Sequence, residues 1–186
     1  MSNVSKVVGV IGCAAGGVEQ LREALVEPLI ERGRRVAVTL TPAAARWLDA
    51  IGETERLADV TGLPVRSEPR LPGEDRPHPP VDAFVVAPAS ASSVAKLALG
   101  IGDNQALSPV CEALGAVPII VFPRVNAAHA RHPAWPAHLD ALRKAGVELI
   151  YGEDVWPLHE PRSAPGKQLP WSAIIETVER ALKPSE

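Results

Sequence analysis

The sequence predicts an α/β protein in which a parallel sheet is doubly wound, with helices on both faces. Five short runs rich in valine, isoleucine and alanine are apolar throughout, as expected for strands that are covered on both sides. The segment after the first run places Leu21, Leu25 and Leu29 four residues apart, which is the period of a helical face. The 186 residues include 46% apolar and 22% charged side chains, which is typical of one compact domain spanning 1–186.

The first 80 residues are predicted to hold two strand–helix pairs and a loop. The expected elements are a strand at 7–11, a helix at 18–32, a strand at 36–40 and a helix at 41–51. Pro28 should kink or shorten the first helix, because proline has no N–H to donate to the preceding turn. Thr41 followed by Pro42 is a favourable helix start. Proline and glycine punctuate residues 63–80, which predicts a long loop.

The rest of the chain is predicted to continue the alternation of strands and helices. The expected elements are a strand at 83–87, helices at 92–99 and 105–114, a strand at 118–122, a helix at 138–145, a strand at 147–150 and a helix at 171–182. Pro88 is expected to close the third strand. A second loop rich in proline and glycine covers residues 151–170.

Composition and charge exclude several functions. A net charge of −3 offers no basic stripe for nucleic acid. No apolar run approaches the length of a membrane span, and residues 1–12 lack the features of a secretory signal, so we expect a cytoplasmic protein. Cys13 and Cys111 are too few for a disulfide framework and are wrongly spaced for zinc, so no metal is expected.

Candidate binding residues follow the predicted strands. In a doubly wound sheet ligands bind at the carboxyl ends of the strands. Three such ends suit one phosphate: the GCAAGG turn at 12–17, Thr41, and the serines of the SASS run at 90–93. GCAAGG departs from the G-x-G-x-x-G pattern, and no acidic residue follows the second strand, which argues against NAD. Taken alone, the serines could also be simple helix caps.

Two segments, 82–104 and 122–150, resemble the homo-oligomeric flavin-containing cysteine decarboxylase family. The PASANT motif of that family is similar to Pro88-Ala89-Ser90-Ala91-Ser92-Ser93, and its A-K-x-A-x-G-x-x-D-N run is kept from Ala95 to Asn104. Its P-x-M-N motif is similar to Pro123-Arg124-Val125-Asn126. The resemblance extends from residue 7 to about 182 and is greatest to the lantibiotic-type peptidyl-cysteine decarboxylases.

The resemblance implies a Rossmann-like or flavodoxin-like subunit that binds FMN, typically between the subunits of a homotrimer or of a dodecamer built from trimers. By motif position, the cofactor contacts would fall on Gly12, Cys13, Ala14, Thr41, Pro88, Ser90, Ala91, Ser92 and Ser93. Ala14, Ala15, Pro88 and Ala89 would offer an apolar slot for the flavin ring.

The resemblance also implies a reaction in which flavin oxidises a cysteine unit to a thioaldehyde, whose C=S group then serves as an electron sink for loss of carbon dioxide. Asn126 would hydrogen-bond the substrate carboxylate, or alternatively fix its own loop. The spacing of the family's catalytic histidine falls on Glu74, and the nearest histidine is His78. His78 is therefore the candidate base. The P-x-M-N-x-x-M-W motif has Val125, His129 and Ala130 in place of its Met, Met and Trp.

The 151–170 segment discriminates among members of the family. It resembles a substrate clamp but has no cysteine, whereas phosphopantothenoylcysteine decarboxylases use a cysteine there to reduce the enethiol intermediate. The resemblance thus favours oxidative decarboxylation of the C-terminal cysteine of a ribosomal peptide, which gives an aminoenethiol. The alternatives are an FMN-binding protein without decarboxylase activity, a phosphopantothenoylcysteine decarboxylase, and a flavin prenyltransferase with Arg124 near the prenyl phosphate.

Overall fold

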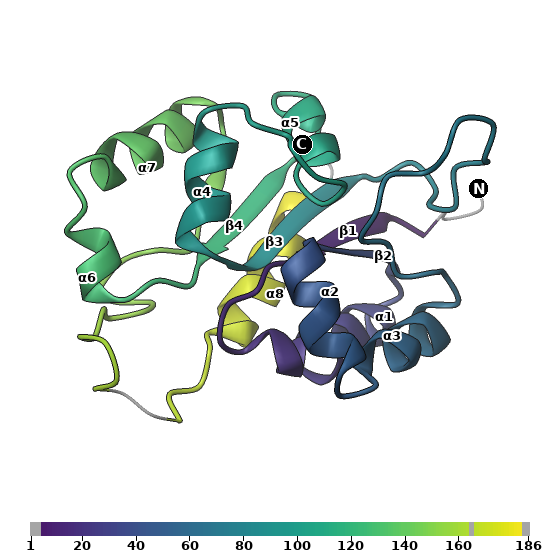
Figure 1. The fold of residues 1–186 in the computed structure, drawn as a ribbon, viewed down its shortest axis with the longest axis horizontal. Coiled ribbons are helices and arrows are strands. Elements are labelled where there is room, and N and C mark those ends of the chain that lie inside the picture. The colour runs from purple at the N-terminus through teal and green to yellow at the C-terminus, as the bar shows by residue number, and fades with distance from the viewer. Residues whose placement is uncertain (1–4, 164–165, 184–186) are drawn as a thin grey trace.

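The computed structural model describes residues 5–163 and 166–183 (Figure 1). Its centre is a five-stranded sheet of order β2-β1-β3-β4-β5 in which every neighbouring pair is parallel. The strands are β1 (Val7–Gly12), β2 (Arg35–Leu40), β3 (Ala83–Ala89), β4 (Ile119–Pro123) and β5 (Glu148–Leu149). The predicted all-parallel sheet is confirmed, and its carboxyl ends lie along one edge because all strands run the same way.

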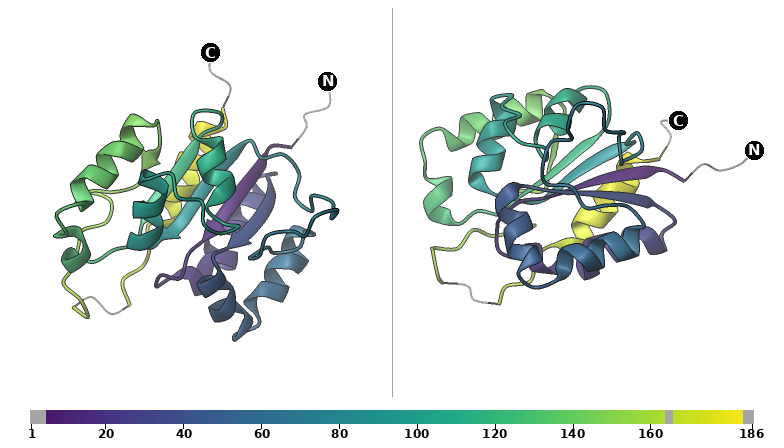
Figure 2. Two further views of the ribbon diagram at one scale, coloured as in Figure 1. Left: turned by 45° about the horizontal axis from the view of Figure 1, so that its top comes forward. Right: turned by 45° about the vertical axis from the view of Figure 1, so that its right-hand side comes forward.

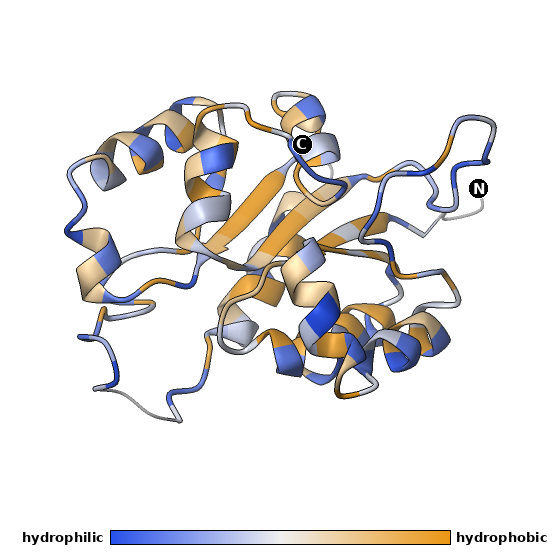
Figure 3. Ribbon diagram, viewed as in Figure 1, coloured by the Kyte–Doolittle hydropathy of each residue, from blue (hydrophilic) through white to orange (hydrophobic). Residues whose placement is uncertain are grey.

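Helices cover both faces of the sheet, as predicted (Figure 2). Successive strand residues alternate between two apolar cores: Val10 faces one, whereas Ile11 faces the other. The first core is closed by the helical segment 18–31 with α2 (Pro42–Asp49), α3 (Glu53–Thr61) and α8 (Trp171–Ala181). The second core is closed by α4 (Ala91–Ala98), α5 (Ser108–Ala113) and α7 (Trp135–Lys144). The strands between these layers are the most apolar part of the chain (Figure 3).

Pro28 does not end the first helix. The helical path passes through a 3₁₀ turn (Val18–Gln20) and a π-helix (Arg22–Val26) into α1 (Glu27–Glu31), with Pro28 near its start. The π-helical turn directly before Pro28 is the local irregularity expected where a proline cannot donate to the preceding turn, and the helical path continues beyond it. Leu21, Leu25 and Leu29 are fully buried, as their four-residue spacing predicts.

Helix α3 was not predicted, because one of its two buried residues is a glutamate that forms an ion pair, and a search for apolar periodicity does not detect it. Gly52 and Gly62, both with positive φ, bound a helix whose buried residues are Glu53 and Leu57. The Glu53 carboxylate accepts hydrogen bonds from Arg22 Nε at 2.8 Å and from Arg56 Nη1 at 2.6 Å. The guanidinium of Arg22 holds the pKa of Glu53 below its usual value. This ion pair joins α3 to the π-helix.

Replacing Glu53 by glutamine is expected to lower the free energy of unfolding by roughly 2 kcal/mol at neutral pH, because Arg22 would keep its charge beside a neutral amide. A carboxyl group whose pKa is lowered by folding stabilises the protein above its unfolded pKa of about 4, and this contribution is lost as the pH falls further. Urea unfolding at pH 7 and pH 3 measures both effects. An equal difference between Glu53→Gln and wild type at the two pH values would contradict the assignment.

Several boundaries differ from the predicted ones. β3 continues through Pro88 to Ala89, and the Pro88 carbonyl accepts a hydrogen bond from Cys13 N, so Pro88 does not close the strand. A short helix, α6 (Ala127–Ala130), was missed, and α7 begins three residues earlier than predicted, at Trp135. In the described ranges no helix is long and apolar enough to cross a membrane, and no cluster of three or more potential metal-binding side chains occurs there.

Candidate functional site

The carboxyl ends of four strands are joined in a row by backbone hydrogen bonds. Thr41 N donates to Gly12 O at 2.9 Å, which joins the ends of β2 and β1. Cys13 N donates to Pro88 O at 3.2 Å, which joins β1 to β3. Arg124 N donates to Ala89 O at 2.8 Å, which joins β3 to β4. The three strand ends that the sequence singled out therefore meet along one side of the sheet, and the end of β4 at Arg124 lies beside them.

Two helices begin at this edge with hydroxyl caps. Thr41 Oγ1 accepts from Ala44 N at 3.4 Å at the start of α2, and Ser90 Oγ accepts from Ser93 N at 3.2 Å at the start of α4. Ser90 Oγ also lies 3.0 Å from Ser93 Oγ. The hydroxyls are thus helix caps. The helix starts still leave backbone N–H groups at one edge, which suits an anion, and Ser92 is exposed in the first turn of α4.

The glycines of the 12–17 turn serve two purposes. A Cβ on Gly12 would lie 2.7 Å from Leu40 Cδ2, and Gly17 has φ of +101° with a Cβ position 2.2 Å from Leu169 Cδ1. Both are needed for close packing. Gly16 is exposed, and the nearest atom to its Cβ position is Arg124 Nη2 at 3.8 Å. The turn is therefore open to a ligand at Gly16, beneath a guanidinium group.

Some predicted cofactor contacts lie in the interior. Cys13 is fully buried, and burial raises the pKa of its thiol more than hydrogen bonding to Ser93 and Ser90 lowers it. A neutral, enclosed thiol packs as a small apolar group. Gly12 and Pro88 are also buried, whereas Ala14, Ser90 and Ala91 are partly exposed. Any cofactor contact with the buried residues has to be made by backbone atoms.

Asn126 lies at the mouth of a pocket of about 370 Å³ beside the end of β4. Its side-chain oxygen accepts a hydrogen bond from His129 N at 3.0 Å and caps α6. Its amide nitrogen makes no hydrogen bond within the described part of the chain, so it keeps two N–H donors for a ligand. The capping role and a substrate contact thus use different atoms of the same side chain.

The 151–170 segment folds over this pocket, although residues 164 and 165 lie outside the described ranges. Ala127 N donates to His159 O at 2.9 Å. The ring of Trp156 is buried and packs edge-on against Phe122, with centroids 5.6 Å apart. Leu169 fills the space above Gly17. The predicted clamp is therefore docked at three points along the carboxyl edge of the sheet.

Two cations share the Trp156 ring. The guanidinium carbon of Arg124 lies 5.0 Å from the ring centroid, and Lys167 Nζ lies 3.8 Å from it. Burial lowers the pKa of Arg124, and burial together with the charge of Arg124 lowers that of Lys167. Within the described ranges Arg124 Nε is buried without a hydrogen-bond partner. Both cations are partly withdrawn from water and form no salt bridge in the described ranges, so this pocket is suited to an anionic ligand. No sequence motif marks Trp156 or Lys167, and both were missed.

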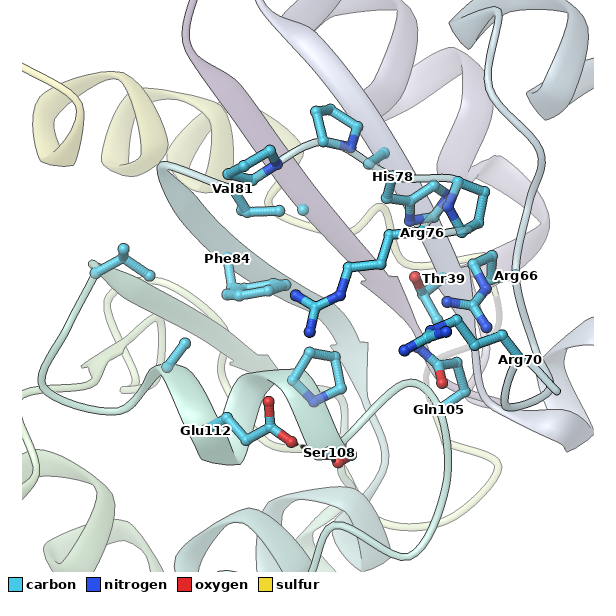
Figure 4. Close-up of a pocket in the computed structure, with 18 residues that line it drawn as sticks. Thr39, Arg66, Arg70, Arg76, His78, Val81, Phe84, Gln105, Ser108 and Glu112 are labelled. Carbon is cyan, nitrogen blue, oxygen red and sulfur yellow. Dashed lines mark hydrogen bonds between the residues drawn. The ribbon is translucent and has the colours of Figure 1, made fainter. Parts of the chain in front are cut away.

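His78 is not brought together with Asn126 within one chain. His78 Nε2 donates to Pro64 O at 2.7 Å, and burial lowers the pKa of the imidazole. His78 lines a second pocket of about 380 Å³, shown in Figure 4, which shares no lining residue with the Asn126 pocket. Glu74, at the family's histidine spacing, is exposed and accepts a hydrogen bond from Leu71 N at 2.7 Å in a turn.

Comparisons with known proteins show which proteins the chain resembles. The family model described as Flavoprotein matches residues 3–183. The coenzyme A biosynthesis bifunctional protein CoaBC of Thermococcus kodakarensis is 28% identical over 185 residues, 96% of this chain and 41% of the relative. The chain therefore spans about two fifths of that relative.

Two solved structures have similar folds. The FMN-dependent cysteine decarboxylase TvaF from thioviridamide biosynthesis is 28% identical, with a TM-score of 0.63 over 77% of this chain and 88% of that one. The FMN-dependent cysteine decarboxylase SpaF is 21% identical, with a TM-score of 0.63 over 94% of this chain and 98% of the other.

Proposed function

Because the chain belongs to the Flavoprotein family, we propose that it is an FMN-dependent enzyme that oxidatively decarboxylates the C-terminal cysteine of a ribosomal peptide to an aminoenethiol. One observation carries the proposal. The free amide of Asn126 lines the same pocket as the uncompensated Arg124, beneath a clamp without cysteine. The likeness to TvaF, an FMN-dependent cysteine decarboxylase, supports the same chemistry.

The carboxyl edge of the sheet fits a phosphorylated flavin. The phosphate would lie against the exposed Gly16 turn and the starts of α2 and α4, at Thr41 and Ser90 to Ser93. Arg124 Nε is buried without a hydrogen-bond partner in the described ranges, which supports the proposal that a polar group of a ligand reaches this end of the sheet. When bound, FMN supplies the two-electron oxidation of the cysteine unit.

The residues of the chain bind and orient the substrate. The amide of Asn126 donates to the departing carboxylate and fixes its position without neutralising it. Trp156 and the docked clamp exclude water. An ion pair with the departing carboxylate would oppose its loss as neutral carbon dioxide, because the pair stabilises the ground state. We therefore assign Arg124 and Lys167 to another anionic group of the cofactor or of the substrate.

The missing clamp cysteine separates this proposal from the coenzyme A route. Without a clamp thiol to return the proton that reduction of the intermediate requires, the product remains the oxidised enethiol. A second candidate function, FMN binding without decarboxylation, is favoured by the separation of His78 from Asn126. A flavin prenyltransferase would instead use Arg124 and Lys167 to hold a prenyl phosphate.

The absorbance spectrum and a mass assay test the proposal together. Purified protein should be yellow and should remove two hydrogens and one carbon dioxide from a peptide ending in cysteine. The same peptide ending in serine is the control. Yellow protein without turnover would favour the second candidate, and turnover of phosphopantothenoylcysteine alone would assign the protein to the coenzyme A route. Protein that takes up no flavin would refute the proposal.

We further propose that a homo-oligomer, a trimer or a dodecamer of trimers, unites the two pockets, because a catalytic role for His78 requires a second copy. Coexpressed His78→Asn and Asn126→Asp chains should then recover about a quarter of wild-type turnover, the share of sites in which both intact residues meet by random mixing. Each variant expressed alone should remain inactive. If the mixture is no more active than the separate variants, His78 does not act across a subunit boundary.

A further inference from the structure

His78 is the one residue of the pocket in Figure 4 to which the proposed reaction gives a role, and that reaction leaves the arginines of the pocket unexplained. We propose that this pocket binds a phosphate ester with a planar ring, a ligand of the nucleotide class. Arg66, Arg70 and Arg76, all from the loop between α3 and β3, line one side of it. The guanidinium of Arg76 extends toward Phe84, while Arg66 and Arg70 lie near Thr39 and Gln105 (Figure 4).

The charge in this pocket is unbalanced. Within the described ranges none of the three arginines forms a salt bridge. Glu112 is the single carboxylate among the lining residues, and it accepts a hydrogen bond from Ser108 Oγ at 3.3 Å. Three cations against one carboxylate leave two positive charges, in a protein whose net charge is −3. A dianion such as a phosphate ester would compensate them.

The loop that carries the arginines is fixed to the sheet. Arg66 N donates to Val38 O at 3.1 Å and Arg66 O accepts from Leu40 N at 2.7 Å, so the loop extends the edge at β2. The hydrogen bond from His78 Nε2 to Pro64 O closes the other end of the loop. Arg70 Nη1 donates to Glu74 O at 2.6 Å, which orients this guanidinium. Arg66 and Arg70 are therefore held before a ligand binds, which favours affinity, whereas Arg76 is exposed and makes no hydrogen bond within the described ranges.

The floor of the pocket is apolar and includes one aromatic ring, that of Phe84. A Cβ on Gly9 would lie 2.6 Å from the ring of Phe84, so the ring lies close over the bare backbone of β1. Ala37 continues this surface, and Thr39 and Gln105 provide polar groups beside the arginines. A volume of about 380 Å³ falls in the usual range for small-ligand sites. Such a site suits a ligand with one planar face and one anionic end.

Calorimetric titration tests the proposal on FMN-loaded protein, in which the carboxyl edge is already occupied. Adenosine diphosphate and inorganic pyrophosphate should bind, with affinities that fall as salt rises, and adenosine should bind more weakly than the diphosphate. The Arg70→Gln, Arg76→Gln double variant should bind both phosphates at least about tenfold more weakly. The matched control is Arg143→Gln on α7, which lines none of these pockets and should leave both affinities unchanged.

Three results would overturn the proposal: no binding of either phosphate at millimolar concentration, equal affinities in the double variant and wild type, or release of FMN by the diphosphate, which would place both ligands in one site. Protein purified without flavin would count against the proposed decarboxylase. In that protein the Arg70→Gln, Arg76→Gln variant would still separate binding in the arginine pocket from binding at the carboxyl ends of the strands, so the two failures are distinguishable.

Discussion

Replacing Asn126 by aspartate is expected to abolish peptide turnover and leave the protein as stable as wild type. The side-chain oxygen of Asn126 caps α6 by accepting from His129 N, and aspartate performs this role equally well. The two N–H donors disappear, however, and a negative charge would face the substrate carboxylate. We expect turnover to fall by roughly 10²–10³-fold, with the free energy of unfolding within about 0.5 kcal/mol of wild type.

Asn126→Ala separates the two roles of this side chain. Alanine removes the cap as well as the donors, so this variant should lose about 1 kcal/mol of stability in addition to its turnover. FMN absorbance of both variants reports whether the cofactor is retained. An Asn126→Asp protein that turns over the peptide at the wild-type rate would show that Asn126 only holds its loop.

Local signals predicted those parts of the fold that local interactions determine. Thr41 and Ser90 begin α2 and α4, and the caps expected from the sequence form in the structure. Helix α3 was missed because Glu53 takes the interior position at which a periodicity argument expects an apolar residue. Its partner Arg22 is 31 residues away, and nothing in the sequence pairs the two side chains. The spacing of apolar residues along the sequence does not reveal long-range ion pairs of this kind.

The candidate site also has a part that the sequence predicts and a part that it does not. Strand ends were predictable, because parallel strands place their carboxyl ends at one edge, and the 12–17 turn, Thr41 and Ser90 do meet there. The contacts of Arg124 and Lys167 with the Trp156 ring were not predictable from the sequence. Trp156 and Lys167 lie in a loop without periodicity, and only the course of that loop in three dimensions brings them to Arg124. His78 shows the same difficulty, because its distance from the motif in sequence does not fix the pocket that it lines.

We expect Arg124 to contribute to ligand binding and to lower the free energy of unfolding of the ligand-free protein. Arg124→Met preserves most of the packing against Trp156 but removes a charge that is half-buried and without a counterion in the described chain. The ligand-free variant should therefore unfold with a free energy about 1 kcal/mol higher than wild type, because the desolvation cost disappears. Its affinity for FMN or for the peptide should fall by about 10–100-fold.

A rise in the free energy of unfolding together with a fall in ligand affinity distinguishes a ligand contact of Arg124 from a structural one. If Arg124 mainly stabilises the clamp by stacking on Trp156, its loss should lower stability, because a cation over a desolvated ring contributes up to about 2 kcal/mol. Arg131→Met is the matched control, since Arg131 is exposed and paired with Glu160 of the same clamp. It should change stability by less than about 1 kcal/mol and leave both affinities unaltered. Destabilisation by Arg124→Met with unchanged binding would assign Arg124 to the fold, and would leave Asn126 as the remaining polar contact proposed for the substrate.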